Sequence, residues 1–182
     1  VGSEMCIRDR NTVTSFSNDN PFVLIAGPCQ VESKDHAVHM CGSLLEISMG
    51  HNIPLVYKSS FDKANRSSIK GKRGLGIDEG LKCLQKVQND FQVPVITDIH
   101  HPEQASVVAE VVDIIQIPAF LCRQTDLIVA AGETGKWVNV KKGQFLSFKE
   151  VANIKDKCPT NKNFLITERG TTFGYNNLVV DM

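Results

Sequence analysis

Short apolar runs alternate with longer helical patterns along this chain. The apolar runs are rich in β-branched residues and predict six strands, at 22–26, 54–57, 93–97, 114–117, 137–140 and 164–167. The segments between them predict helices at 34–49, 78–91, 102–111, 125–131, 148–157 and from residue 177 onward. Because strand and helix alternate strictly and the strands are almost wholly apolar, the pattern predicts a parallel sheet covered by helices.

Polar side chains follow each predicted strand. In strand order they are Cys29 with Gln30, Lys58, Asp98 with His100, Gln116, Lys141 with Lys142, and Glu168 with Arg169. The carboxyl ends of parallel strands lie at one edge of a sheet, where α/β barrels and open sheets bind ligands. We therefore expect these side chains to form one ligand-binding face.

The segment after the second strand, KSSFDKANRSS at 58–68, carries the densest set of candidate ligand groups. It places the cations Lys58, Lys63 and Arg66 among serine hydroxyls and the amide of Asn65. Several cations of one sign, combined with hydroxyl and amide groups, can hold a phosphate or a carboxylate from several sides. This segment predicts an anion site.

Composition limits what such a site serves. The chain has 182 residues, 42% of them apolar and 22% charged, which predicts one globular domain. Lys and Arg together number 20, and so do Asp and Glu, which gives a net charge of zero. No overall electrostatic field therefore attracts nucleic acid or a membrane surface. No apolar run approaches the length of a membrane span. Small phosphorylated molecules are the expected ligands, with neither nucleic acid nor membrane as a partner.

The six cysteines contain no C-x-x-C pair or regular framework, which predicts reduced thiols in the cytoplasm. Four of them are expected to be small buried apolar residues, namely Cys41, Cys83, Cys122 and Cys158. Cys29 differs because it follows a strand end.

Other motifs predict no further chemistry. The glycine-rich segment 71–76 lacks the G-x-G-x-x-G spacing and follows no strand directly, which disfavours an organic dinucleotide cofactor. The segment 130–137 resembles a P-loop imperfectly and instead predicts a helix end capped by Gly135. His36 and His39 lie three apart on a predicted helix without a third ligand nearby, so we expect surface residues.

Seven motifs in order resemble the 3-deoxy-D-manno-octulosonate 8-phosphate synthase family. They are AGPC at 26–29, KSSFDKANRSS at 58–68, TDIH at 97–100, QIPAFL at 116–121, RQTD at 123–126, NVKKGQF at 139–145 and RG at 169–170. The resemblance implies a (β/α)8 barrel that condenses phosphoenolpyruvate with arabinose 5-phosphate, releases phosphate and serves lipopolysaccharide synthesis. It also implies a homotetramer when the protein is full length.

The same resemblance implies a role for each matching residue. The phosphoenolpyruvate carboxylate would be held by Lys58 and Lys63, near Gln116, and its phosphate by Lys141, Arg169 and the backbone at Ala119. Arabinose 5-phosphate would contact Asn65, Arg66 and Ser67, with Arg123 reaching a phosphate across a subunit contact. Asp98 and His100 would organise the attacking water, with a structural role for His100 left open. Lys63 is a third catalytic candidate, and the remaining substrate-binding candidates are Ser60, Phe120 and Gln144.

Cys29 decides a subclass within that family, in which metal-dependent members have cysteine at this position and metal-independent members have asparagine. A thiolate at a strand end suits Zn or Fe(II), with Mn as a further candidate. The resemblance therefore implies a divalent metal at Cys29, with the other ligands on later strands.

The chain departs from the family in two respects. Only six strands are predicted where a barrel needs eight, so we expect residues 11–182 to be a partial barrel domain that lacks the last two strands. Residues 1–10 match nothing in the family and are expected to be a non-native leader. Two alternatives stay open: a related synthase that accepts erythrose 4-phosphate, disfavoured by Asn65, and a non-catalytic phospho-ligand binding domain, disfavoured by Cys29, Asp98 and His100.

Overall fold

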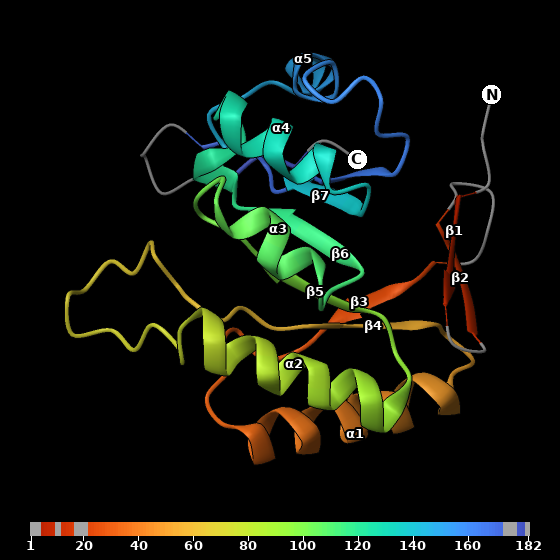
Figure 1. Cartoon of the computed structure of the whole chain (residues 1–182). Helices are drawn as coiled ribbons and strands as arrows, with labels where there is room; N and C mark the ends of the chain where they lie inside the picture. Colours follow the sequence, from red (N-terminus) through yellow and green to blue (C-terminus); the bar gives the residue numbers. More distant parts are fainter. Residues whose placement is uncertain (1–4, 10–11, 17–21, 173–177, 181–182) are drawn as a thin grey trace. The chain divides into compact units, whose positions relative to one another are not determined.

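The computed structural model describes residues 5–9, 12–16, 22–172 and 178–180. It divides into two compact units (Figure 1), the first formed by Val1–Thr97 with Val111–Asp113 and the second by Asp98–Glu110 with Ile114–Met182. Each unit has its own strands, helices and buried apolar residues.

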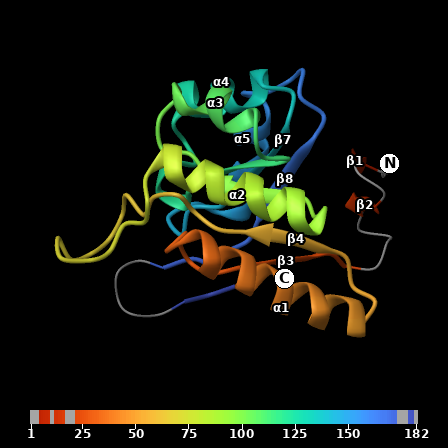
Figure 2. The ribbon, with the colours of Figure 1, turned by 60° about the horizontal axis from the view of Figure 1, so that its bottom comes forward.

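The first unit holds an N-terminal hairpin and the first strand–helix repeats. Strands β1 (Met5–Asp9) and β2 (Thr12–Phe16) pair antiparallel. The parallel strands follow sequence order and, with their helices, are β3 (Leu24–Ala26), α1 (Lys34–Gly50), β4 (Leu55–Lys58), α2 (Ile77–Phe91) and β5 (Val95–Asp98). The last residue of β5, Asp98, belongs to the second unit. Helices α1 and α2 lie side by side along β3 and β4 (Figure 2).

Local sequence explains where these two helices begin and end. The Ser33 side chain accepts a hydrogen bond from the His36 N–H at 3.1 Å and caps the start of α1. Helix α2 has acidic residues in its first turn, where they suit the helix dipole, and ends at Gln92, whose φ of 54° is left-handed. Val56 and Tyr57 of β4 are fully buried, which is expected for a strand between two neighbours under helices.

The second unit repeats the strand–helix pattern. Its elements are α3 (Gln104–Ala109), β6 (Ile114–Ile117), η1 (Ala119–Leu121), α4 (Thr125–Glu133), β7 (Trp137–Lys141), η2 (Phe148–Glu150), α5 (Val151–Lys155) and β8 (Phe164–Thr167). Strands β6, β7 and β8 are parallel neighbours in that order. The four residues of β6 are buried, and α3 packs against α4.

All six predicted strands are present, three in each unit, and the pairings among them within a unit are parallel. The predicted fold class is confirmed: an α/β chain of the (β/α)8 type that contributes six strands. Gly135 has a φ of 71° just after α4, as expected for a helix cap. No helix among the described residues is long and apolar enough to cross a membrane.

Three helix predictions need correction. Helix α3 is shorter than 102–111, and the segment 148–157 divides into η2 and α5. Of the helix predicted from residue 177, Leu178–Val180 are described and are not helical: Val179 pairs with Thr171 through hydrogen bonds of 2.6 and 3.0 Å. The β-branched Val179 and Val180 favour this extended pairing over a helix.

Candidate functional site

The carboxyl ends of β3 and β4 approach closely in the first unit. Gly27 follows β3, and a Cβ built on it would lie 1.8 Å from the Lys58 carbonyl oxygen, so glycine alone fits there. Beyond that contact, Gln30 and Ser60 form a parallel bridge. Two predicted site residues, Lys58 and Ser60, therefore share an edge with the segment that carries the exposed thiol of Cys29.

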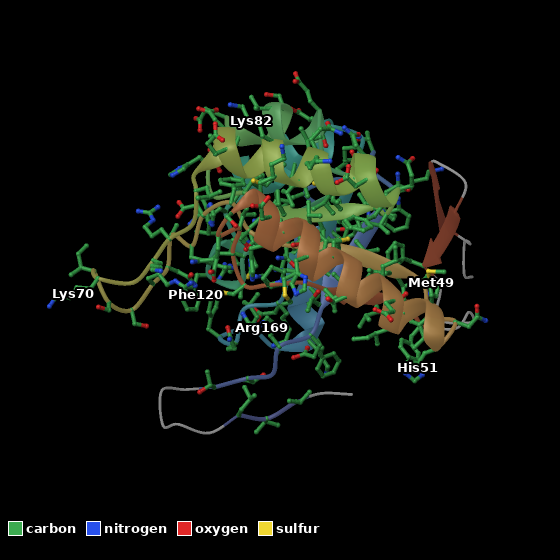
Figure 3. All side chains as sticks on the ribbon, turned by 90° about the horizontal axis from the view of Figure 1, so that it is seen from below. Met49, His51, Lys70, Lys82, Phe120 and Arg169 are labelled. Carbon is green, nitrogen blue, oxygen red and sulfur yellow. The ribbon has the colours of Figure 1, made fainter. Side chains whose placement is uncertain are left out.

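The long loop between β4 and α2 is closed at its base by side-chain and backbone contacts. The Arg73 guanidinium donates from Nε to Asp62 Oδ1 at 2.8 Å and from Nη2 to Asp62 Oδ2. The Lys63 N–H donates to the Arg73 carbonyl at 2.7 Å, and Lys63 Nζ donates to Ser60 Oγ at 2.7 Å. Figure 3 shows Lys70 at the outer tip of this loop. The base of the loop thus holds Lys63 next to the end of β4.

Arg66 is held from two sides within the same loop. Its Nη2 donates to Gln30 Oε1 at 2.6 Å, and its Nε donates to the Lys72 carbonyl at 2.9 Å. Asn65 and Ser67, on either side of it, are exposed. The guanidinium is therefore oriented by the loop and by the segment after β3, while its two neighbours are accessible to a ligand.

A chain of hydrogen bonds crosses the strands of the second unit. The Asp98 carboxylate, in a residue 2% exposed, accepts from Gln116 Nε2, and Gln116 Oε1 accepts from Asn139 Nδ2 at 3.0 Å. Asn139 Oδ1 in turn accepts from the Thr167 hydroxyl at 3.0 Å. Lys141 Nζ lies 3.6 Å from Asp98 Oδ1. A buried carboxylate is thereby oriented by an amide and paired with an ammonium at the strand ends.

This network fixes the Gln116 amide and includes two residues that are not among the predicted site residues. Gln116 points its nitrogen toward Asp98 and its oxygen toward Asn139. Asn139 and Thr167 are the additional members. A polar residue between the apolar Val138 and Val140 was the available signal for Asn139, since a buried amide needs partners.

The loops that follow β5 and β6 carry four more predicted residues. The His100 N–H donates to Gln104 Oε1 at 2.8 Å, and the residue is half-buried. Ala119 begins η1 and is buried, whereas Phe120 is 62% exposed. Arg123 is exposed too, and its carbonyl accepts from Lys157 Nζ at 2.7 Å. The structure therefore offers the Phe120 ring and the Arg123 guanidinium on the surface of this unit.

The loops after β7 and β8 hold the last two predicted residues. The Gln144 carbonyl accepts from the Thr172 N–H at 3.0 Å, which links the two loops. Arg169 has an exposed side chain (Figure 3), and its N–H donates to Glu168 Oε1 at 2.9 Å. The predicted residues thus form two groups, one in each unit, and their roles toward substrate stay predictions.

The buried cysteines behave as expected for apolar residues. Burial raises the pKa of the Cys41 thiol to about 12 and also raises the pKa of Cys83, Cys122 and Cys158. All four thiols are free and buried, so this prediction is confirmed. Cys29 is a free exposed thiol, and the side chain of Cys6 lies outside the described part of the chain.

Metal ligands are sparse in this part of the protein. No group of three or more His, Cys, Asp or Glu side chains that could hold an ion occurs among the described residues. His39 is exposed, as expected of a surface residue, whereas His36 is half-buried. Cys29 is accessible to an ion, but the described residues do not complete a set of ligands around it.

Comparison with known proteins places the chain in a family. The family model described as "DAHP synthetase I family" matches residues 6–182. Proteins named 2-dehydro-3-deoxyphosphooctonate aldolase from Rickettsia bellii (strain OSU 85-389) and Rickettsia prowazekii (strain Madrid E) are each 58% identical over 169 residues. The match covers 92% of this chain and 62% of each relative, so the chain spans less than two thirds of their length. The chain belongs to the DAHP synthetase I family.

Proposed function

We propose that the protein containing this chain is a transferase that condenses phosphoenolpyruvate, arabinose 5-phosphate and water to 3-deoxy-D-manno-octulosonate 8-phosphate and phosphate. The name shared by relatives of 57–58% identity supports this reaction. The observation that carries the proposal is the buried Asp98 carboxylate, oriented by Gln116 and lying 3.6 Å from Lys141. Simple anion binding needs cations but no buried carboxylate, so this arrangement favours chemistry over binding alone.

The cations would bring two multiply charged anions together against their mutual repulsion. In our proposal Lys58 and Lys63 neutralise the phosphoenolpyruvate carboxylate, while Lys141 and Arg169 neutralise its phosphate. Fixed charges suit this task because they need little reorganisation during the reaction. The hydrogen bond from Lys63 Nζ to Ser60 Oγ and the contact of Lys141 with Asp98 support pre-orientation of both lysines.

The sugar phosphate is assigned to the loop between β4 and α2. Arg66 would bind the phosphate of arabinose 5-phosphate, with Asn65 and Ser67 beside it. The two contacts that hold the Arg66 guanidinium support this assignment, since less side-chain entropy is lost when the ligand binds.

The proposed condensation makes one C–C bond and breaks one C–O bond. C3 of the enol attacks the sugar aldehyde carbon, whose oxygen takes up a proton, while water adds at C2 of the enol and gives up a proton. The bond between C2 and the phosphate oxygen then breaks as the C2 hydroxyl loses its proton and becomes the carbonyl of the product. We propose that Asp98 and His100 position that water, with Asp98 accepting one of its protons. The hydrogen bond from Gln116 keeps the Asp98 carboxylate in one orientation for this role.

Phosphate release by the complete protein tests the proposal. We expect release that requires both phosphoenolpyruvate and arabinose 5-phosphate, with a 3-deoxy-octulosonate 8-phosphate as the second product. Faster release with erythrose 4-phosphate would favour the related synthase. Binding of phosphoenolpyruvate without release under either condition would favour the non-catalytic domain and overturn the proposed activity.

A divalent metal at Cys29 is part of the proposal, although the described residues contain no group of three or more possible ligands. We expect the purified protein to contain about one equivalent of Zn, Fe or Mn, since an accessible thiolate binds such ions well. The Cys29→Asn variant should lose that metal. A chelator should abolish the activity of the protein that has Cys29, but not the activity of the Cys29→Asn variant. Elemental analysis measures the metal content. The control is Cys158→Ser, which replaces a buried thiol.

Compartment and assembly complete the proposal. Five free thiols support a reducing, cytoplasmic setting. In the proposed homotetramer the exposed Arg123 would reach a phosphate across a subunit contact, and neither nucleic acid nor membrane is proposed as a partner. Size-exclusion chromatography with light scattering would measure the number of copies.

A further inference from the structure

Lys142 is fully buried, unlike its neighbour Lys141. Side chains alternate between the two faces of a strand, and these lysines follow one another at the end of β7. Lys141 accordingly reaches Asp98, while Lys142 points to the other side, where its Nζ lies 3.5 Å from Glu168 Oε1. Two adjacent lysines thus have different surroundings.

The Lys142 ammonium has all three of its hydrogens engaged by the protein. Nζ donates to the carbonyls of Leu146 and Gly170 at 3.0 Å each and to that of Gly143 at 3.3 Å. An ammonium has three donors and no acceptor, so none remains for a substrate. Because burying an unpaired charge is costly, the three carbonyls and the nearby Glu168 carboxylate account for its position.

These contacts join the loop after β7 to the loop after β8. The Lys142 N–H donates to the Thr167 carbonyl at 2.9 Å, which extends the pairing of the two strands by one residue. In the second loop Glu168 accepts from the N–H groups of Arg169 and Gly170. Lys142 therefore contacts both ends of the short turn that presents Arg169.

We propose that Lys142 is a positioning residue, which fixes the Glu168–Gly170 turn so that the Arg169 guanidinium faces the phosphate of phosphoenolpyruvate. This inference rests on the proposed function. The two adjacent lysines would then have different roles: Lys141 contacts substrate, and Lys142 acts through Arg169. Gly170, at a φ of 76°, lets the chain turn directly after the arginine and present its carbonyl to Lys142.

The test compares Lys142→Met, Lys142→Arg and the exposed control Lys162→Met in the complete protein. In Lys142→Met we expect KM for phosphoenolpyruvate to rise about tenfold while KM for arabinose 5-phosphate stays unchanged. A general loss of folded protein would lower kcat and leave both KM values alone. A KM for phosphoenolpyruvate in Lys142→Arg that lies between those of Lys142→Met and the unmodified protein supports the proposal. An unchanged KM for phosphoenolpyruvate in Lys142→Met overturns it.

A double variant separates action through Arg169 from direct contact with substrate. If Lys142 works through Arg169, adding Lys142→Met to Arg169→Ala should raise KM for phosphoenolpyruvate no further, because coupled residues are not additive. The proposal would be overturned if the rise in KM for phosphoenolpyruvate in the double variant equalled the product of the rises in the two single variants. If Lys142→Met fails to fold, Glu168→Gln decides: a higher KM for phosphoenolpyruvate supports the proposal, and an unchanged one contradicts it.

A readout without turnover keeps this inference distinct from the proposed reaction. Backbone amides at 168–170 should exchange with deuterium faster in Lys142→Met than in Lys162→Met, whatever the substrates are. Equal exchange would overturn the proposal. Faster exchange in a protein that releases no phosphate would retain the structural role of Lys142 and contradict the proposed function alone.

Discussion

Replacement of Asp98 by asparagine is expected to lower kcat/KM about a hundredfold or more while the protein stays folded. Asparagine has nearly the same size, and its oxygen can still accept from Gln116, but it carries no charge. The Asp98 and Lys141 side chains are only 3% and 17% exposed, so their 3.6 Å contact is poorly screened. Opposite charges at such a distance attract by roughly 4 kcal/mol at an effective dielectric constant of 20.

The expected loss of rate corresponds to about 2.7 kcal/mol, since each tenfold change is about 1.4 kcal/mol. Asp98→Asn removes the carboxylate that is proposed to accept a proton from the attacking water, which accounts for the loss of rate. Initial rates of phosphate release measure the effect, and thermal unfolding checks the fold. The exposed Asp156, at the end of α5 in the same unit, provides Asp156→Asn as a control that should change neither quantity. Asp98→Asn with wild-type kinetics would remove Asp98 from the proposed chemistry.

The strands were predictable because their apolar runs coincide with burial. Strand β6, at Ile114–Ile117, and β8, at Phe164–Thr167, have the predicted bounds, and the other four parallel strands differ by at most two residues at either end. The segment 177–182 was less predictable, because a short apolar sequence suits either helix or strand until a partner is known. Pairing of Val179 with Thr171 decides it in the described residues.

The residues of the candidate site were predictable from their type and their position after a strand. The contacts among their side chains were not predictable. Strand ends identify Asp98, Gln116 and Lys141, because parallel strands bring such positions to one edge. The pairing of Asp62 with Arg73 depends on the path of a long loop, which no local pattern specifies. The difference between Lys141 and Lys142 was accessible in principle, since consecutive strand residues face opposite sides.

Replacement of Gly27 by alanine is expected to destabilise the protein by about 1–3 kcal/mol, the usual range for forcing extra atoms into a packed site. The added Cβ would lie 1.8 Å from the Lys58 carbonyl oxygen and 2.7 Å from its carbonyl carbon. Both are backbone atoms in the strand end, so no flexible side chain can move aside. Relief requires β3 and β4 to separate at the edge that carries Lys58.

The structure provides a matched control in Gly50, the last residue of α1, where a Cβ would have no neighbour within 4 Å. Gly50→Ala should change the free energy of unfolding by less than about 1 kcal/mol, and in the stabilising direction, because alanine is the better helix former. Urea unfolding of both variants measures the difference. If Lys58 binds the phosphoenolpyruvate carboxylate, its displacement in Gly27→Ala should also raise KM for phosphoenolpyruvate, whereas Gly50→Ala should leave KM unchanged. Equal unfolding free energies in the two variants would show that the ends of β3 and β4 separate without cost and are not held together by the glycine contact.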